Sequence, residues 1–209
     1  MEFIDFLMES YSRCRLSVKT DRVVALSGLE DRIARALNCQ RRYGIFASYL
    51  HRNLLWLRSD KKMERIGYGT QNVPSWSWMA YDGGIWFMDI QFGTVNWIND
   101  LRFDNEREHA LITDVGEFRD CVMKQEGEDY AILDFGGTNR GWIRYDVERG
   151  EDLRKERCVV VGRKYDHGVK KYYMLLVRQK GVDDEYERVG IGWIQSEYVL
   201  RQRLNVRVI

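Results

Sequence analysis

The sequence predicts an α+β fold, with about three N-terminal helices packed on a C-terminal antiparallel β-barrel or sandwich. Apolar residues recur at helical spacing through roughly the first 60 residues, which is typical of amphipathic helices. After Pro74, the only proline, short runs rich in Val, Ile and aromatic residues alternate with turn residues. Because the helices come first and the strands follow, α+β is favoured over α/β. We expect one compact domain, with a helical part over residues 1–60 and a β part over 74–209.

Three segments have the spacing of helices: 2–15, 20–37 and 44–58. Thr20-Asp21 is a typical start signal for the second helix, and Gly28 is a weak point that permits a later start. The third segment places apolar and aromatic side chains on one side: Phe46, Tyr49, Leu50, Leu54 and Leu57. These patterns predict the helical part of the fold.

The remainder of the chain has the pattern of short strands. Eight are expected, over residues 85–90, 94–103, 109–123, 129–134, 141–147, 157–164, 171–178 and 188–194. Residues 59–73 are polar, charged and contain glycine, so a loop is expected there. A short helix over 196–201 is expected before a last strand over 205–209. Many short strands at close spacing are typical of an antiparallel barrel or sandwich.

The composition argues against several classes of function. The 209 residues carry a net charge of +1 with a pI near 7.6, whereas a dominant nucleic-acid interface needs a basic surface. We therefore expect no nucleic-acid partner. No apolar run is long enough to span a bilayer, and the acidic N-terminal residues do not resemble a signal peptide. The four cysteines lie far apart, so free thiols and a reducing, cytoplasmic location are expected.

Motifs for common catalytic chemistry are missing from the sequence. The histidines His51, His109 and His167 have no metal-ligand spacing, so no metal site is expected. The chain has no Gly-x-Ser-x-Gly elbow, and its Gly-x-Gly segments lack the rest of a phosphate-binding loop. We therefore expect no cofactor. A catalytic triad assembled from distant positions stays open.

The sequence contains an excess of large aromatic side chains. Trp76 and Trp78 lie one residue apart where the chain enters the β part, so both are expected on one face, as a core floor or a pocket wall. A small barrel does not easily fill its inside with so many large rings, which favours an apolar pocket. Six substrate-binding residues are predicted: Trp76, Trp78, Trp86, Trp97, Trp142 and Tyr68.

Two neighbouring residues are the candidate catalytic groups. The phenol of Tyr81 would donate a hydrogen bond to a substrate carbonyl, as electrostatic stabilisation requires. The carboxyl of Asp82 would act as the acid of an isomerisation. For Asp82 the competing interpretation, turn chemistry and surface charge, is the favoured one.

Several segments taken in order resemble one family. They are Tyr11-Ser12-Arg13, Asp21-Arg22, Ala25-Leu26-Ser27-Gly28-Leu29, Leu54-Leu55-Trp56, Pro74-Ser75-Trp76-Ser77-Trp78 with Asp82-Gly83, and Arg188-Val189-Gly190. Together they resemble the region that follows the HET domain in fungal heterokaryon-incompatibility proteins. Phe46 stands where that family usually has Trp, and Met79-Ala80-Tyr81 replaces its Ala-Ser-x. The HET domain itself would lie upstream of Met1, so the resemblance covers the C-terminal region only and a stand-alone protein is expected.

Three functions follow as hypotheses. The first is a small-molecule-binding protein of fungal secondary metabolism, a cofactor-free cyclase of the pericyclic or Diels–Alder type. Its substrate would be an apolar terpenoid or polyketide, which an aromatic pocket would hold in a reactive shape. The alternative, which the resemblance implies, is a non-enzymatic recognition module of a HET-type incompatibility or cell-death system, with a partner protein. A purely scaffolding role is the third.

Overall fold

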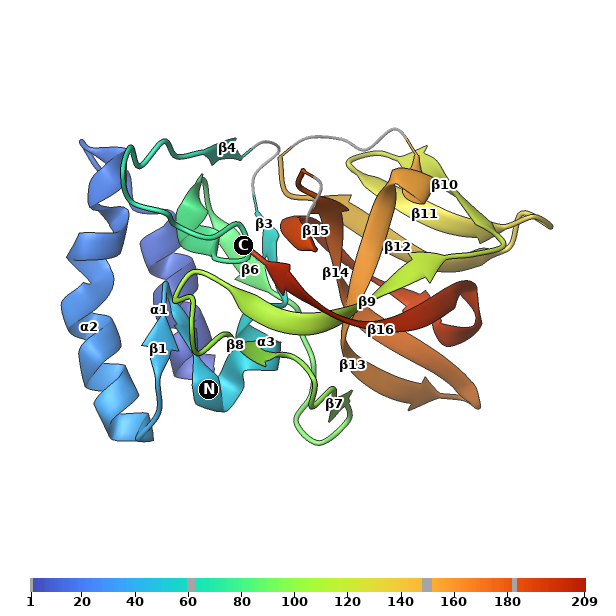
Figure 1. Cartoon of the computed structure of the whole chain (residues 1–209), viewed down its shortest axis with the longest axis horizontal. Helices are drawn as coiled ribbons and strands as arrows, with labels where there is room; N and C mark the ends of the chain where they lie inside the picture. Colours follow the sequence, from blue (N-terminus) through green and yellow to red (C-terminus); the bar gives the residue numbers. More distant parts are fainter. Residues whose placement is uncertain (1, 60–62, 148–151, 182–183) are drawn as a thin grey trace.

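The chain forms three helices and a large, mostly antiparallel sheet, so the α+β prediction is confirmed at that level. The computed structural model describes residues 2–59, 63–147, 152–181 and 184–209. In Figure 1 the helices gather at one end of the molecule and the long strands at the other. No helix in these described ranges has the length and hydropathy that crossing a bilayer requires.

The helices of the described residues are α1 (Glu2–Ser12), α2 (Arg22–Leu37) and α3 (Leu50–Asn53). Short 3-10 turns are η1 (Lys19–Asp21), η2 (Ala47–Tyr49), η3 (Trp78–Ala80), η4 (Leu153–Lys155) and η5 (Ser196–Tyr198). The first two predicted helices are confirmed, with α1 ending three residues early. Helix α2 continues through Gly28, so the later start is wrong. It ends where Asn38 adopts a left-handed conformation and donates its N–H to the last turn.

The predicted third helix over 44–58 is wrong. Gly44 has a φ of +79°, which turns the chain out of a helical path before the apolar run begins. After the single turn of α3, the backbone of Trp56 and Leu57 pairs with the strand over Ile85–Phe87. A helical apolar pattern therefore folds as a strand, one helical turn and another strand, because distant partners take its backbone hydrogen bonds.

The main sheet has ten strands in the described residues. They are β7 (Asn96–Trp97), β8 (Arg102–Phe103), β9 (Leu111–Phe118), β10 (Cys121–Glu126), β11 (Asp129–Asp134), β12 (Asn139–Tyr145), β13 (Glu156–Asp166), β14 (Val169–Gln179), β15 (Glu185–Gln195) and β16 (Val199–Val208). Their order is β10-β11-β12-β15-β14-β13-β9-β16, with β7 beside β13 and β8 beside β9. A short parallel pairing joins β16 to β15.

Three two-stranded pairs belong to the other half of the molecule. They are β1 (Arg41–Arg42) with β2 (Ile45–Phe46), β3 (Trp56–Arg58) with β6 (Ile85–Phe87), and β4 (Glu64–Arg65) with β5 (Tyr81–Asp82). Strand β4 falls in the segment that was expected to be a loop. This half of the chain therefore contains more sheet than its sequence pattern predicts.

Most strand predictions are confirmed with shifted ends, and three segments differ. The single strands expected over 94–103 and 109–123 are each two strands. In the second segment the break comes at Asp120, whose φ of +54° makes the β9–β10 turn. The last strand begins at Val199, so the short helix before it is only the turn η5. Pairing with β9 extends this strand into a sequence that is polar and lacks strand alternation.

The sheet separates two apolar clusters through the alternation of side chains along its strands. On β13, Cys158 and Val160 belong to one cluster while Val159 and Val161 belong to the other. The cluster with Val159 also contains residues of α1, α2 and α3. This cluster therefore packs the helical end of the molecule against one face of the sheet (Figure 1).

Helix α1 covers the free edge of β6. Ser12 Oγ accepts a hydrogen bond from the N–H of Ile85 at 3.0 Å, and Glu9 Oε1 accepts one from Phe87 at 2.9 Å. Arg13 donates to the carbonyl of Ile85 at 3.1 Å. Side chains of a helix therefore satisfy the backbone groups that a neighbouring strand would otherwise take, which protects this edge from further pairing.

Candidate functional site

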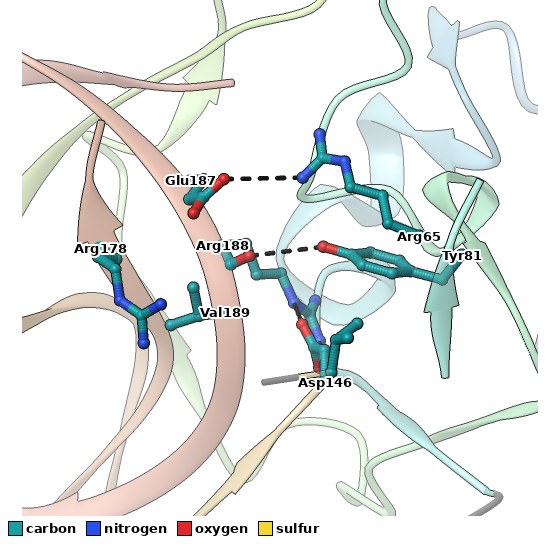
Figure 2. A pocket seen from close by; sticks show the side chains of 8 residues that line it. Arg65, Tyr81, Asp146, Arg178, Glu187, Arg188 and Val189 are labelled. Atoms are coloured by element: carbon teal, nitrogen blue, oxygen red, sulfur yellow. Dashed lines mark hydrogen bonds and ion pairs between the residues drawn. The ribbon is translucent and has the colours of Figure 1, made fainter. Parts of the chain in front are cut away.

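A pocket of about 150 Å³ lies where β4 and β5 meet the main sheet (Figure 2). Its lining residues are Arg65, Tyr81, Asp146, Val147, Arg178, Glu187, Arg188 and Val189. Most of them are charged or polar. The pocket is thus a polar recess between the two halves of the molecule and differs in kind from the predicted apolar chamber.

A buried ion pair borders this pocket. Arg188 Nε lies 2.9 Å from Asp146 Oδ2, and Arg188 Nη2 lies 3.2 Å from Oδ1 of the same carboxylate. Both side chains are about 1 % exposed or less. Burial raises the pKa of Asp146 above its ordinary value, and the Arg188 guanidinium opposes that rise. The two-point contact supplies the geometry in which a buried pair of this kind can remain charged.

Arg188 also reaches across to the first half of the chain. It donates to the carbonyl of Leu54 at 2.7 Å and to that of Trp56 at 2.5 Å. Its guanidinium carbon lies 3.4 Å from the ring centroid of Trp56, a cation–π contact in a buried setting. The Arg188 backbone N–H donates to Ser75 Oγ at 2.8 Å. One arginine therefore ties β15 to β3 and to the segment before η3.

Two further buried arginines make similar ties. Arg22 donates to the carbonyls of Tyr81 and Ser12 at 2.8 and 2.9 Å. Arg58 donates to the carbonyl of Tyr145 at 2.9 Å. Buried guanidinium groups are uncommon, and these are paired mainly with backbone oxygens between separate elements. Their hydrogen bonds therefore hold separate elements together within the core.

The sequence did not predict most of these buried polar contacts between elements. Arg22 and Arg188 belong to segments that carried the family resemblance, but Asp146 and Arg58 lie outside them. A charged residue at the start of an expected apolar strand, such as Arg188 before Val189, is the signal that would have found one of them. The family-like segments thus contribute contacts that hold the two halves of this fold together.

The two tryptophans at the start of the β part, Trp76 and Trp78, do not lie in a strand. Both Trp76 and Trp78 are fully buried, but η3 begins at Trp78, where Ser77 Oγ accepts the N–H of Met79 at 3.0 Å. Trp76 donates its indole N–H to the carbonyl of His109 at 3.2 Å. The expectation of a strand here is therefore wrong, because the chain turns at Trp76, where the N–H of Ser77 donates to the carbonyl of Pro74 at 3.1 Å, and η3 begins at Trp78.

The indole of Trp78 is packed against a glycine. A Cβ placed on Gly44 would lie 2.6 Å from Trp78 Nε1, so only glycine leaves room for this ring. Trp78 Nε1 is also a buried donor with no hydrogen-bond partner among the described residues. Its ring lies 5.8 Å from the guanidinium carbon of Arg22. This contact with Arg22 adds to the packing that holds Trp78 in the core.

The other four predicted binding residues lie apart from one another. Tyr68 donates to the carbonyl of Met79 at 2.7 Å, and burial raises its pKa to about 12. Trp97 stacks on His51 with ring centroids 5.8 Å apart. Trp142 is half-buried on β12, and Trp86 is 47 % exposed on β6. The structure does not bring these rings into one cavity, and their role in ligand binding stays a prediction.

The two candidate catalytic residues point to different surroundings. Tyr81 lines the pocket, where Figure 2 shows its hydroxyl aimed at the backbone oxygen of Arg188. Burial raises the pKa of Tyr81 well above its ordinary value, so this phenol keeps its proton. Asp82 lies on the other side of β5, where its Oδ2 is 2.6 Å from Lys19 Nζ. Asp82 is thus an ion-pair partner in a shallow surface groove.

A different surface is rich in exposed aromatic side chains. We define the α1–β6 face by Phe3, Phe6, Trp86 and Phe92, which are 69, 61, 47 and 64 % exposed. Phe6 and Phe92 line a groove of about 420 Å³ together with Phe87 of β6. Trp86 lies under the guanidinium of Arg13, at 3.7 Å from the ring centroid. This face presents large rings to solvent beside charged groups.

Comparisons with known proteins add no assignment to this picture. No family model, curated protein or solved structure matches this chain. The resemblance to the region behind HET domains therefore stays a prediction. The described residues also contain no group of three or more His, Cys, Asp or Glu side chains arranged to hold a metal ion.

Proposed function

We propose that the protein is a non-enzymatic recognition module that binds a partner protein through the α1–β6 face. The observation that carries the proposal is the exposure of large rings on and beside α1 and β6, two of which, Phe6 and Phe92, line one groove. Scattered single exposed apolar residues are normal, whereas rings that gather on one face are typical of interaction surfaces. Aromatic residues are also the side chains that contribute most to binding energy at interfaces.

A cyclase has weaker support from the geometry. Pockets for drug-sized ligands usually span about 300–1,000 Å³ with mainly apolar walls. The recess at Tyr81 is about 150 Å³ and carries charged walls, and a cavity of that size is suited to a molecule such as benzene. Trp76 and Trp78 present no surface to a ligand. The cyclase stays a prediction that would need these rings to move.

The β part is proposed to be a barrel that serves as a rigid support for this face. Strand β16 pairs with β9 along most of its length and with β15 at Glu185 and Tyr186. This double pairing supports closure of the strands β15, β14, β13, β9 and β16 on themselves. A closed sheet would resist deformation when a partner binds at the helical end.

The test is site-specific photo-crosslinking in the protein's native cells. A photoreactive phenylalanine analogue at Phe92 is expected to yield one adduct of defined mass. The second substitution Phe6→Asp should remove that adduct, because it places a charge in the same groove. Phe135 is the matched control, since it is 77 % exposed in the turn between β11 and β12. Equal adducts from Phe92 and Phe135, or none from Phe92, would contradict the proposal.

A titration with apolar terpenoids and polyketides separates the two functions. Recognition of a protein predicts no saturable change in tryptophan fluorescence. A saturable change that Trp76→Phe abolishes in a folded variant would favour the cyclase instead.

A further inference from the structure

The α1–β6 face has a different charge at each end. At the end beside Phe6 and Phe92, the groove is lined by the carboxylates Asp5, Glu9 and Asp89 and one guanidinium, Arg52. At the other end, a groove of about 650 Å³ is lined by the cations Arg13, Arg15 and Lys19 and the carboxylates Glu64 and Asp82. Trp86 lies on β6, under Arg13 of the basic groove.

Each end carries an exposed charged residue without an ion pair in the described part of the chain. Lys19 is held by Asp82 at 2.6 Å, and Arg13 covers Trp86. Arg15 is exposed and has no ion pair among the described residues. The same holds for Asp89 in the acidic groove within the described part of the chain. Arg15 and Asp89 therefore contribute unpaired charge at the basic and acidic ends, and Arg13, which among the described residues contacts a carbonyl and a ring rather than a carboxylate, adds to the basic end.

A surface with carboxylates and exposed rings at one end and cations at the other is complementary to itself. Rotation about a two-fold axis through its centre places the basic end of one copy on the acidic end of the other, so that cations meet carboxylates and the exposed rings of Phe6 and Phe92. Such an isologous arrangement is the commonest symmetry of soluble oligomers. Resting on the proposed function, we infer that the partner of the α1–β6 face is a second copy of this chain, with Arg15 of each copy opposite Asp89 of the other.

The charge order also suits helix α1 by itself. Carboxylates near a helix N-terminus and cations near its C-terminus complement the helix dipole. That explanation accounts for Asp5 and for Arg13 and Arg15, which lie along or just beyond α1. It does not account for Asp89, which follows β6, or for the exposed rings of Phe6 and Phe92. Self-association accounts for all of them.

The experiment is sedimentation of the purified chain over a range of concentrations and salt. The full chain is expected to form a dimer that weakens at high salt, because exposed charges are screened. Arg15→Glu and Asp89→Arg should each weaken the dimer at least tenfold, because each places like charges opposite one another. The control Phe135→Asp should leave it unchanged, and circular dichroism would verify that each variant is folded.

Charge reversal offers a sharper readout. In a two-fold dimer, the double variant Arg15→Glu with Asp89→Arg restores both pairs, so it should dimerise like the natural sequence. An equimolar mixture of the two single variants should form a heterodimer. In one of its two contacts the introduced glutamate meets the introduced arginine, and in the other the natural Arg15 meets the natural Asp89. Dimerisation that both single variants leave intact would overturn the inference.

The outcomes also separate this inference from the function on which it rests. A purified chain that stays monomeric at all concentrations, combined with a photo-crosslinked adduct whose mass is not twice that of the chain, overturns self-association and leaves recognition of another protein. A monomer without any adduct overturns both.

Discussion

The guanidinium carbon of Arg188 lies over Trp56, 3.4 Å from the ring centroid, while two guanidinium nitrogens contact the carboxylate of Asp146. Arg188 and Asp146 lie on the sheet side, and Trp56 belongs to β3 in the first half of the chain. Arg188 therefore joins the two halves of the molecule through hydrogen bonds, an ion pair and a ring contact. It explains why the boundary between the halves is polar in part and still buried.

Removing the charge of Arg188 should be among the most destabilising single changes. We expect Arg188→Met to lower the free energy of unfolding by about 3–5 kcal/mol, since Asp146 would be left as an unpaired buried carboxylate. Urea denaturation measures this. Arg65→Met is the control from the same pocket, because Arg65 is half-exposed and meets Glu187 at 3.7 Å. It should cost no more than about 0.5 kcal/mol.

The double variant Arg188→Met with Asp146→Leu refines that prediction. It removes both charges, so it should be less destabilised than Arg188→Met alone. Some loss should persist, because the carbonyls of Leu54 and Trp56 lose their donor. A double variant as unstable as the single one would show that the ion pair is not the main contribution.

Substitution of Gly44 tests the packing of Trp78. Gly44→Ala should cost about 3 kcal/mol, because it combines a left-handed backbone with an overpacked contact at 2.6 Å. Gly69→Ala is the matched control. Gly69 also has a positive φ, but a Cβ there meets nothing within 4 Å, so about 1 kcal/mol is expected from the backbone alone. Thermal melting of the two variants gives the comparison, and equal losses would contradict the steric explanation.

The substitution Gly28→Ala should stabilise the protein. Gly28 lies in the interior of α2, its φ is helical, and an added Cβ meets nothing within 4 Å. Alanine restricts the unfolded chain and favours the helix, so stability should rise by about 1 kcal/mol. A higher midpoint in urea, with an unchanged slope, would verify this. A loss of stability would mean that the exposed side of α2 is not free.

The stability of the protein at low pH should depend on Asp104. Burial would raise the pKa of this carboxyl, but hydrogen bonds from Arg207 and from the N–H groups of Glu106 and Arg107 outweigh it and lower the pKa. A lowered pKa means that the unfolded state takes up the proton first. The contribution is therefore present above about pH 4, the unfolded value, and is lost as the pH falls through the folded value.

Asp104→Asn supplies the control for that dependence. Denaturation midpoints measured between neutral and acidic pH should fall less steeply in this variant than in the natural sequence. Parallel profiles would show that Asp104 does not contribute to the acid sensitivity.

The predictions of structure succeeded where one local rule decided the outcome. In β13 and β14 the alternation of apolar side chains serves two clusters at once, and the strands appear where the sequence places them. Helix α2 carries its own stop residue, Asn38, which adopts the left-handed conformation. The segment 44–58 failed, because its apolar spacing suits a helix while β6 and Gly44 hold it in another shape.

The predictions of a site depended on longer-range contacts and succeeded less. Two tryptophans separated by one residue are predicted to share a face because side chains alternate along a strand, but Trp76 lies in a turn and Trp78 begins η3. Whether a ring fills a core or lines a cavity depends on what packs against it from elsewhere in the chain. For Trp78 that neighbour is Gly44, 34 positions earlier in the sequence.

The amino-acid sequence by itself determined the class of the fold, because the period of apolar residues is a local property that sets which backbone can bury them. Only the tertiary structure decided that Arg188, Asp146 and Trp56 meet, and that Trp76 and Trp78 are buried in the core. Those outcomes depend on which distant groups satisfy a buried charge or fill a space, and spacing along the chain does not encode such pairings.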